Sequence, residues 1–249
     1  WRPKVQPTGV AGLERLCVGA GEEKGGPGVG ERIASLVEEA RKSYHQVVIG
    51  GPALLGTVEG RIFSHVADGV LVVLSGGQVR KEAAKLIKEA GMKAAFGGQP
   101  CMLTQKLGLC TLDDAARKAC ITELKRCMDM AYELGCVGFG VLSGPVPDDP
   151  SKYGEATDRL VDSLLELCAY SAQCGTMPVV LETFDRVPFG KNALIGPTKE
   201  AVEVSKRVRK EFPSFGLMLD LSHAPLLGET SADMLGTAGD HMVHAHIGN

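Results

Sequence analysis

The chain has 249 residues, of which 44% are hydrophobic and 23% charged, and its formal net charge at pH 7 is −3. This composition is ordinary for a globular protein of one large or two smaller domains. A net charge this small argues against the basic surface of a nucleic-acid-binding protein. The longest apolar runs, such as Gly69–Leu74, are far shorter than the roughly 20 residues of a membrane helix. We therefore expect neither a nucleic-acid nor a membrane partner.

Eight cysteines occur, and none of them forms a C-x-x-C pair. Most lie within apolar helical patterns, where cysteine behaves as a small hydrophobic residue. We expect reduced, buried thiols in a cytoplasmic protein, with disulfides or a zinc cluster as the alternative. The sequence opens on Trp1-Arg2-Pro3-Lys4, without an initiator Met or an apolar signal region, so we expect an excerpt from a longer product.

The first 90 residues have a texture of their own. Gly and Pro are frequent up to residue 30, and a helical pattern follows from Gly30 to about Ser43. Two short apolar runs, Gln46–Ile49 and Gly69–Leu74, suit buried parallel strands, and a helix is expected from about Val79 to Ala90. This part is predicted to be a small α/β segment with parallel strands.

From Met92 onward, short apolar runs alternate with amphipathic helices. Helices are predicted from a capping box of Thr111 and Asp114 to Gly135, over Gly154–Cys174, from Thr198, and over Ser231–Ala238. Such alternation implies parallel strands with right-handed crossovers, in an open sheet or in a barrel. The predicted strands are Lys93–Phe96, Val137–Leu142, Met177–Leu181, Phe215–Leu219 and His241–Ile247.

Polar residues follow several of these predicted strands. Glu182 and Asp220 each come directly after an apolar run, and the last run contains His244 and His246 on one face. Active sites of (β/α) barrels are built at the carboxyl ends of the strands. Two carboxylates and an imidazole suit Mn²⁺, Mg²⁺, Co²⁺ or Zn²⁺. We therefore predict a divalent metal site here and a partial (β/α)8 TIM barrel of about five βα units.

Several segments of residues 92–249 together resemble the xylose isomerase-like TIM barrel superfamily, which includes sugar and sugar-phosphate isomerases and epimerases. The order and spacing of these short motifs are specific to the superfamily and not to a substrate. The segments are Gly98-Gln99-Pro100, LTQKL (103–107), GFGVLSG (138–144), LETFDR (181–186), LIGPT (194–198), LMLDLSH (217–223) and VHAHIGN (243–249).

The resemblance implies a site. It assigns Glu182, Asp220 and His246 as metal ligands, Glu182 and His223 as catalytic residues, and Gln99, His223 and His244 as substrate contacts. It also implies that a carboxylate removes the proton next to a sugar carbonyl, through a metal-stabilised enediolate. The partner would be a small sugar or sugar phosphate, and a homo-oligomer is left open. A second catalytic Glu normally follows on the last strand; none follows here, so we expect a truncated barrel.

The first part has a resemblance of its own. PTGVAGLERL (7–16), HQVVIGGPALL (45–55) and ADGVLVVLSG (67–76) resemble the C-terminal half of bacterial polysaccharide-biosynthesis tyrosine kinases, which have a P-loop ATPase fold. Gly50 stands where that family places an Asp for Mg²⁺, and no P-loop is present. We therefore predict a non-catalytic kinase-like segment over 1–90 and a truncated barrel over 91–249.

Other interpretations stay open. The chain could be a fused remnant without activity, or a metal-dependent phosphodiesterase or endonuclease of the same fold. Three runs of the first part, Leu13–Val18, Gln46–Ile49 and Gly69–Leu74, could stand in for missing barrel strands. At the site, Glu182 could pair with Arg186, Asp220 could form a structural hydrogen bond with His223, and His246 could be a core histidine.

Overall fold

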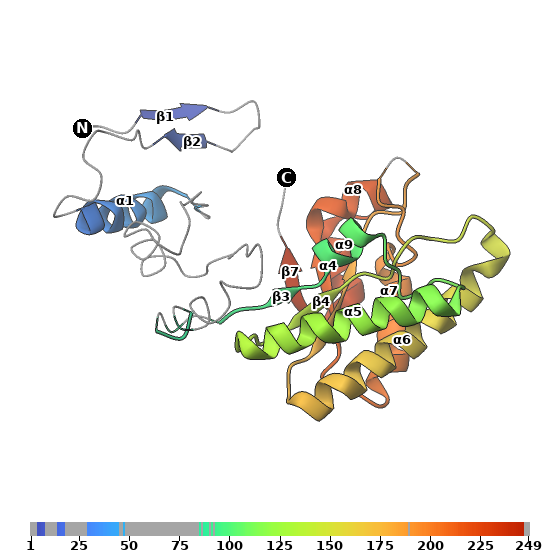
Figure 1. Ribbon diagram of the computed structural model, residues 1–249. Coiled ribbons are helices and arrows are strands. Elements are labelled where there is room, and N and C mark those ends of the chain that lie inside the picture. The colour runs from blue at the N-terminus through green and yellow to red at the C-terminus, as the bar shows by residue number, and fades with distance from the viewer. Residues whose placement is uncertain are drawn as a thin grey trace. The chain divides into compact units, whose positions relative to one another are not determined.

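The computed structural model describes residues 4–7, 14–17, 29–44, 47, 85, 87–89, 91, 93–188 and 190–246 (Figure 1). The chain divides into two compact units, Trp1–Val72 and Val73–Asn249. Among the described residues, no helix is long and apolar enough to cross a membrane.

In the part of the first unit that the structure describes, there are a two-stranded antiparallel sheet and one helix. Strand β1 (Lys4–Pro7) pairs with β2 (Glu14–Cys17), and helix α1 spans Val29–Ser43 as predicted. Among the described strands, β2 pairs with β1 and not with the barrel sheet, so the run Leu13–Val18 does not substitute for a barrel strand there. The predicted parallel strands at 46–49 and 69–74 lie, apart from Val47, outside the described residues.

The second unit is built on a parallel sheet of five strands in the order β3-β4-β5-β6-β7, which is the half-barrel expected from the sequence. Each strand follows its predecessor in both sequence and space, as successive βα units do. The strands are β3 (Phe96–Gly97), β4 (Phe139–Val141), β5 (Val179–Thr183), β6 (Gly216–Asp220) and β7 (Met242–His246).

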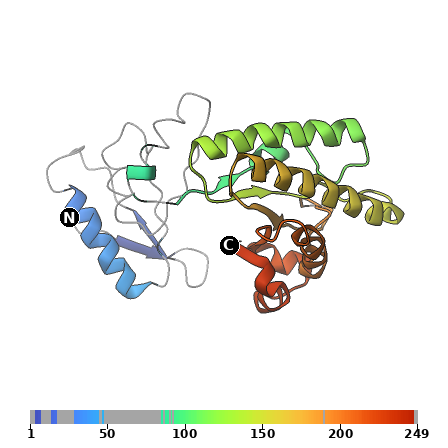
Figure 2. The same cartoon turned by 90° about the horizontal axis from the view of Figure 1, so that it is seen from below.

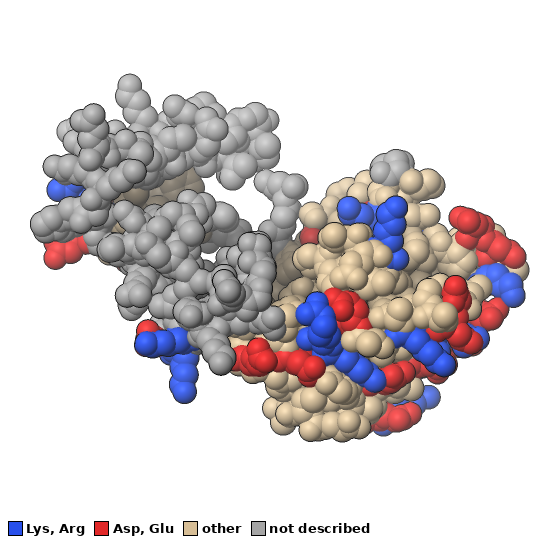
Figure 3. Space-filling model, in the orientation of Figure 1, with Lys and Arg blue, Asp and Glu red and all other residues tan. Residues whose placement is uncertain are grey.

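Helices form a layer along one side of this sheet. α5 packs against α6, α6 against α7 and α7 against α9, and Figure 2 shows α5 and α6 running side by side. On the surface of this unit that Figure 3 shows, acidic and basic side chains are interspersed. The helices are α4 (Gln99–Gln105), α5 (Asp114–Glu133), α6 (Tyr153–Cys174), α7 (Thr198–Arg209), α8 (Ala224–Leu227) and α9 (Ser231–Ala238).

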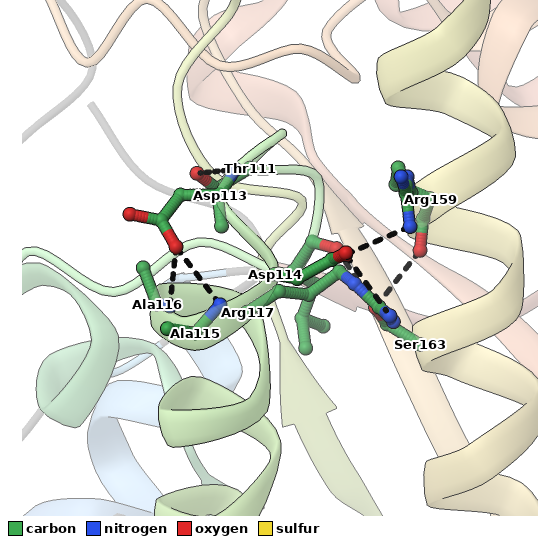
Figure 4. Close-up of polar contacts among 9 residues, drawn as sticks. Thr111, Asp113, Asp114, Ala115, Ala116, Arg117, Arg159 and Ser163 are labelled. Atoms are coloured by element: carbon green, nitrogen blue, oxygen red, sulfur yellow. Dashed lines mark hydrogen bonds and ion pairs between the residues drawn. The ribbon is translucent and has the colours of Figure 1, made fainter.

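The start of α5 differs from the prediction. The N-cap is Asp113, whose Oδ1 accepts hydrogen bonds from the backbone N–H groups of Ala115 (2.8 Å) and Ala116 (3.0 Å) (Figure 4). The predicted capping box of Thr111 and Asp114 is therefore wrong. The Asp113 carboxylate, one residue before the helix, satisfies two backbone N–H groups at once.

Asp114 instead helps to join α5 to α6. Its Oδ1 accepts a hydrogen bond from Arg159 at 2.8 Å and lies 3.7 Å from Arg117 (Figure 4). Arg117 also donates to Ser163, whose hydroxyl donates in turn to the carbonyl of Leu109. These contacts fix the first turn of α5 against the helix that follows it.

Side chains alternate between the two faces of the sheet. Val179, Leu181 and Leu217 belong to the apolar core beneath the helices. Their neighbours Glu182 and Met218 pair across β5 and β6 and therefore face the other way. The face away from the helices thus carries the polar residues at its carboxyl end.

The cysteines with described side chains are free thiols, and all of them except Cys101 and Cys174 are buried. Burial raises the pKa of Cys110, Cys120 and Cys168 to about 12, so these thiols are protonated at neutral pH. The expectation that these cysteines are buried is confirmed for these positions.

Candidate metal centre

Three successive strands bring two carboxylates and an imidazole together. Asp220 and His246 are the last residues of β6 and β7 and pair directly, while Glu182 is the penultimate residue of β5. Because Glu182 pairs with Met218, all three side chains lie on the same face of the sheet. One ligand atom from each lies within 4.8 Å of the other two. The predicted ligand set therefore converges.

Glu182 is buried, with 4% of its surface exposed. Its Oε2 accepts a hydrogen bond from Gln99 Nε2 at 3.0 Å, and its Oε1 lies 3.4 Å from His246 Nδ1. Burial raises the pKa of Glu182, while the hydrogen bond from Gln99 and the charge of His246 act in the opposite direction. A buried carboxylate beside a second one is costly unless a cation compensates both.

Asp220 is oriented by the turn that follows β6. Its Oδ1 accepts hydrogen bonds from the backbone N–H (2.9 Å) and the hydroxyl (2.6 Å) of Ser222. Its Oδ2 lies 3.7 Å from His223 Nε2, which is too long for a hydrogen bond. The alternative of a structural Asp220–His223 hydrogen bond is therefore wrong, and Oδ2 is available to a cation.

His223 lies between two carboxylates. Its Nδ1 is 3.8 Å from Asp185 Oδ2, and its ring packs at 4.1 Å from that of Phe184. Asp185 is itself buried, and its Oδ1 accepts hydrogen bonds from the backbone N–H groups of Lys191 and Asn192. Asp185 was not predicted as a site residue, although it lies in the LETFDR segment just after β5, where polar residues of such a site are expected.

The two histidines of β7 share the polar face of the sheet. His244 pairs with Met218 in the register, and its ring meets that of His246 edge-on at 5.1 Å. Burial, and then the neighbouring His246, lower the pKa of His244, which favours its neutral form. The His246 side chain is 47% exposed, so it is not a core histidine.

Arg186 does not pair with Glu182. Its guanidinium bonds both carboxylate oxygens of Glu200 and also donates to the carbonyls of Ala193 and Leu194. The alternative in which Glu182 is a structural partner of Arg186 is therefore wrong.

Comparison with known proteins places this geometry in a family. A sequence model described as "Xylose isomerase-like TIM barrel" matches residues 65–249. The chain belongs to this family. Its match begins before the first described strand of the barrel unit, β3.

Solved epimerase structures share the fold of this xylose isomerase-like barrel. D-psicose 3-epimerase of Clostridium cellulolyticum H10, solved with D-tagatose, aligns with a TM-score of 0.56 at 23% identity, over 68% of this chain and 56% of the epimerase. An L-ribulose 3-epimerase aligns with a TM-score of 0.60 at 17% identity, over 71% and 58%. The chain thus spans less than two thirds of these epimerases.

A longer alignment is found with 3-keto-D-glucoside 4-epimerase YcjR of E. coli, at a TM-score of 0.57 and 18% identity, over 82% of this chain and 77% of that one. The kinase resemblance is also confirmed, over a short stretch. Tyrosine-protein kinase YwqD of Bacillus subtilis (strain 168) is 36% identical over 58 residues, which are 23% of this chain and 24% of the kinase.

Within this xylose isomerase-like barrel, the donors suit a divalent metal. Two carboxylates and one imidazole are ligands for Mg²⁺, Mn²⁺, Co²⁺ or Zn²⁺, and three protein ligands leave positions for substrate oxygens. The buried, raised-pKa carboxyl of Glu182 is what a cation would compensate. Glu182, Asp220 and His246 therefore fit the group.

Gln99 is placed for this centre by two glycines. A Cβ atom on Gly140 would lie 2.6 Å from Gln99 Nε2, and one on Gly97 would lie 3.0 Å from Gln99 Oε1. The absence of side chains at both positions leaves room for the Gln99 amide to reach Glu182. Gln99 Oε1 is buried and lacks a hydrogen-bond partner among the described residues, so it can accept one from a bound molecule.

Proposed function

We propose that the barrel unit is a metal-dependent isomerase or epimerase of a sugar or sugar phosphate, acting by proton transfer next to the carbonyl. The convergence of Glu182, Asp220 and His246 at three adjacent strand ends carries this proposal. The family assignment and the fold shared with sugar epimerases support it.

The metal is proposed to be held by Glu182, Asp220 and His246. When bound, it would polarise the sugar carbonyl and an adjacent hydroxyl oxygen, which acidifies the proton on the carbon between them. Gln99 orients Glu182 through its 3.0 Å hydrogen bond. Gln99 and Glu182 are thus proposed to define the side of the sugar carbon from which the carboxylate of Glu182 would approach it.

Glu182 is also proposed as the base. Removing a proton from carbon requires a carboxylate that can hold the proton until it is returned to another carbon or to the other face. Burial raises the pKa of Glu182 in the metal-free site, whereas a bound cation would act in the opposite direction. His223, which lies between Asp185 and Asp220, is proposed to hydrogen-bond a substrate hydroxyl, and His244 is proposed as a further substrate contact.

The part of the chain before the family match, up to about residue 64, is proposed to form a separate, non-catalytic segment, while residues 65–90 fall within the match to the barrel family. The short likeness to a tyrosine kinase supports a different ancestry from that of the barrel. The alternative function for the whole chain is a remnant that keeps the fold without turnover. Metal binding with no proton exchange would favour this alternative.

The test combines metal content with solvent exchange. Purified protein should contain about one equivalent of a divalent metal at this centre, and should catalyse exchange of the proton next to the carbonyl in D₂O for one sugar of a panel of free and phosphorylated ketoses and aldoses. Asp220→Asn and Glu182→Gln should lose both. Asp148→Asn, on an exposed loop carboxylate, is the matched control. Metal-free protein whose properties are unchanged in the two variants would refute the proposal.

A further inference from the structure

A second group of metal-binding side chains lies between α4 and α5. Cys101 is on α4, and Glu123 and Cys127 are one turn apart on the same face of α5. One ligand atom from each lies within 4.8 Å of the other two. We refer to Cys101, Glu123 and Cys127 as the thiol cluster. None of them belongs to the Glu182 centre.

The spacing within the thiol cluster suits a tetrahedral ion. Cys101 Sγ lies 3.5 Å from Glu123 Oε1. A tetrahedral zinc ion with its usual bond lengths would separate a sulfur and an oxygen ligand by about 3.6 Å. Gln105 Nε2 lies 3.2 Å from Cys101 Sγ and 3.3 Å from Glu123 Oε1. Turning this amide over would present its oxygen as a fourth ligand.

The charges around the thiol cluster favour a divalent cation. Arg126 donates to both carboxylate oxygens of Glu123, at 2.6 and 2.9 Å, and is the charged group facing it. Two thiolates and one carboxylate, offset by one guanidinium, leave two negative charges. A divalent ion neutralises them, whereas a monovalent ion does not.

The thiol cluster is buried on one side and exposed on the other, so an ion could enter from solvent and be retained. Cys127 is 2% exposed and packs in the core, whereas Cys101 is partly exposed and Gln105 is exposed. The cluster therefore has an apolar floor and an open side toward solvent. Thiolates are soft ligands, which select zinc-type ions over Mg²⁺ or Mn²⁺.

We propose that the thiol cluster is a second metal site, which takes a thiophilic divalent cation of the zinc type and clamps α4 to α5. On binding, Cys101 and Cys127 each release a proton to solvent and form a metal–sulfur bond. The proposal does not depend on the catalytic centre, because its ligands are different residues with a different preference.

The test is a titration of the full chain with Cd²⁺ under a phosphine reductant, followed by the ultraviolet sulfur-to-metal charge-transfer band. The band should saturate at one equivalent and disappear on competition with Zn²⁺. Cys101→Ser and Cys127→Ser should abolish it. Cys101→Ser is the safer variant, because Cys127 is a core residue. In the Asp220→Asn background, in which the Glu182 centre is disabled, Zn²⁺ should also raise the melting temperature, and adding Cys101→Ser should remove that rise.

Two controls separate the thiol cluster from other ligands. Cys174→Ser removes an exposed thiol at the end of α6 and should leave the band intact. Asp220→Asn removes the proposed catalytic metal and should also leave it intact, so failure of one site is distinguishable from failure of the other. Absence of the band, its persistence in Cys101→Ser, or its loss in Cys174→Ser would overturn the proposal.

Discussion

The side-chain amide of Gln99 donates a hydrogen bond to Glu182 Oε2 at 3.0 Å, which joins the start of α4 to the carboxyl end of β5 across 83 residues of sequence. Such a contact fixes the orientation of a buried ligand and favours its ionised form. Gln99 is thus a hydrogen-bond partner of a proposed metal ligand as well as a predicted substrate contact.

Replacing Gln99 by Leu should weaken metal binding at the Glu182 centre by about 10- to 100-fold, the usual effect of losing a partner that orients a ligand. Metal affinity by calorimetry on the full chain measures this. Gln173→Leu, on an exposed position of α6, is the control and should bind as wild type does. Equal affinity in Gln99→Leu would show that Glu182 needs no orienting partner.

Gly140→Ala should act through Gln99. The new Cβ would lie 2.6 Å from Gln99 Nε2, and this flexible side chain would move away at little cost in folding free energy. Metal affinity should therefore fall while the melting temperature changes little. The double variant with Gln99→Leu should bind no more weakly than Gln99→Leu alone, because both changes remove the same hydrogen bond. Gly138→Ala, whose Cβ would meet nothing within 4 Å, is the matched control.

The stability of the metal-free protein should depend on the ionisation of Glu182. Burial raises the pKa of Glu182 in the folded state, so folding favours the protonated carboxyl. This contribution is complete below the unfolded pKa and is lost as pH rises through the folded pKa. With a chelator present, Glu182→Gln should therefore melt a few degrees above wild type at neutral pH, and the gap should close in acid. Glu166→Gln, at an exposed position paired with Lys125, is the control and should melt close to wild type, because surface ion pairs contribute little to stability.

The sheet could be predicted from the sequence because its strands are buried apolar runs. Each of the five predicted runs overlaps an observed strand, although β5 continues to Thr183 and β3 is reduced to Phe96–Gly97. The ends of a strand are set by hydrogen bonding to the neighbouring strand. A single sequence shows which residues are apolar but does not show which residues pair. Helix α4 was missed because it is short and has Pro100 in its first turn.

The convergence of Glu182, Asp220 and His246, the proposed metal ligands, could be predicted because the carboxyl ends of parallel strands meet. The partners of those ligands could not. Gln99 reaches Glu182 because Gly97 and Gly140 leave space for its side chain. Asp185, which lies beside His223, is held by backbone N–H groups of a loop that folds back onto it. Such contacts depend on distant segments and leave no periodic signal. The roles of Gln99, His223 and His244 toward substrate stay predictions.

The N-cap of α5 can be tested, because the sequence pattern predicted Thr111 and the structure has Asp113 in that role. Asp113 accepts two backbone hydrogen bonds at the start of a 20-residue helix, whereas the Thr111 hydroxyl accepts one long bond of 3.4 Å from Asp113 N. Asp113→Ala should lower the free energy of unfolding by about 1 kcal/mol, within a range of roughly 0.5–2 kcal/mol.

Thr111→Ala should change the free energy of unfolding by less than about 0.5 kcal/mol, as for a substitution away from a cap. Denaturant unfolding of both variants, followed by circular dichroism, makes the comparison. If Thr111→Ala were the more destabilising, the capping box predicted from sequence would be correct and Asp113 would not be the cap. The expected order follows from the number of N–H groups that each side chain satisfies, which is two for Asp113.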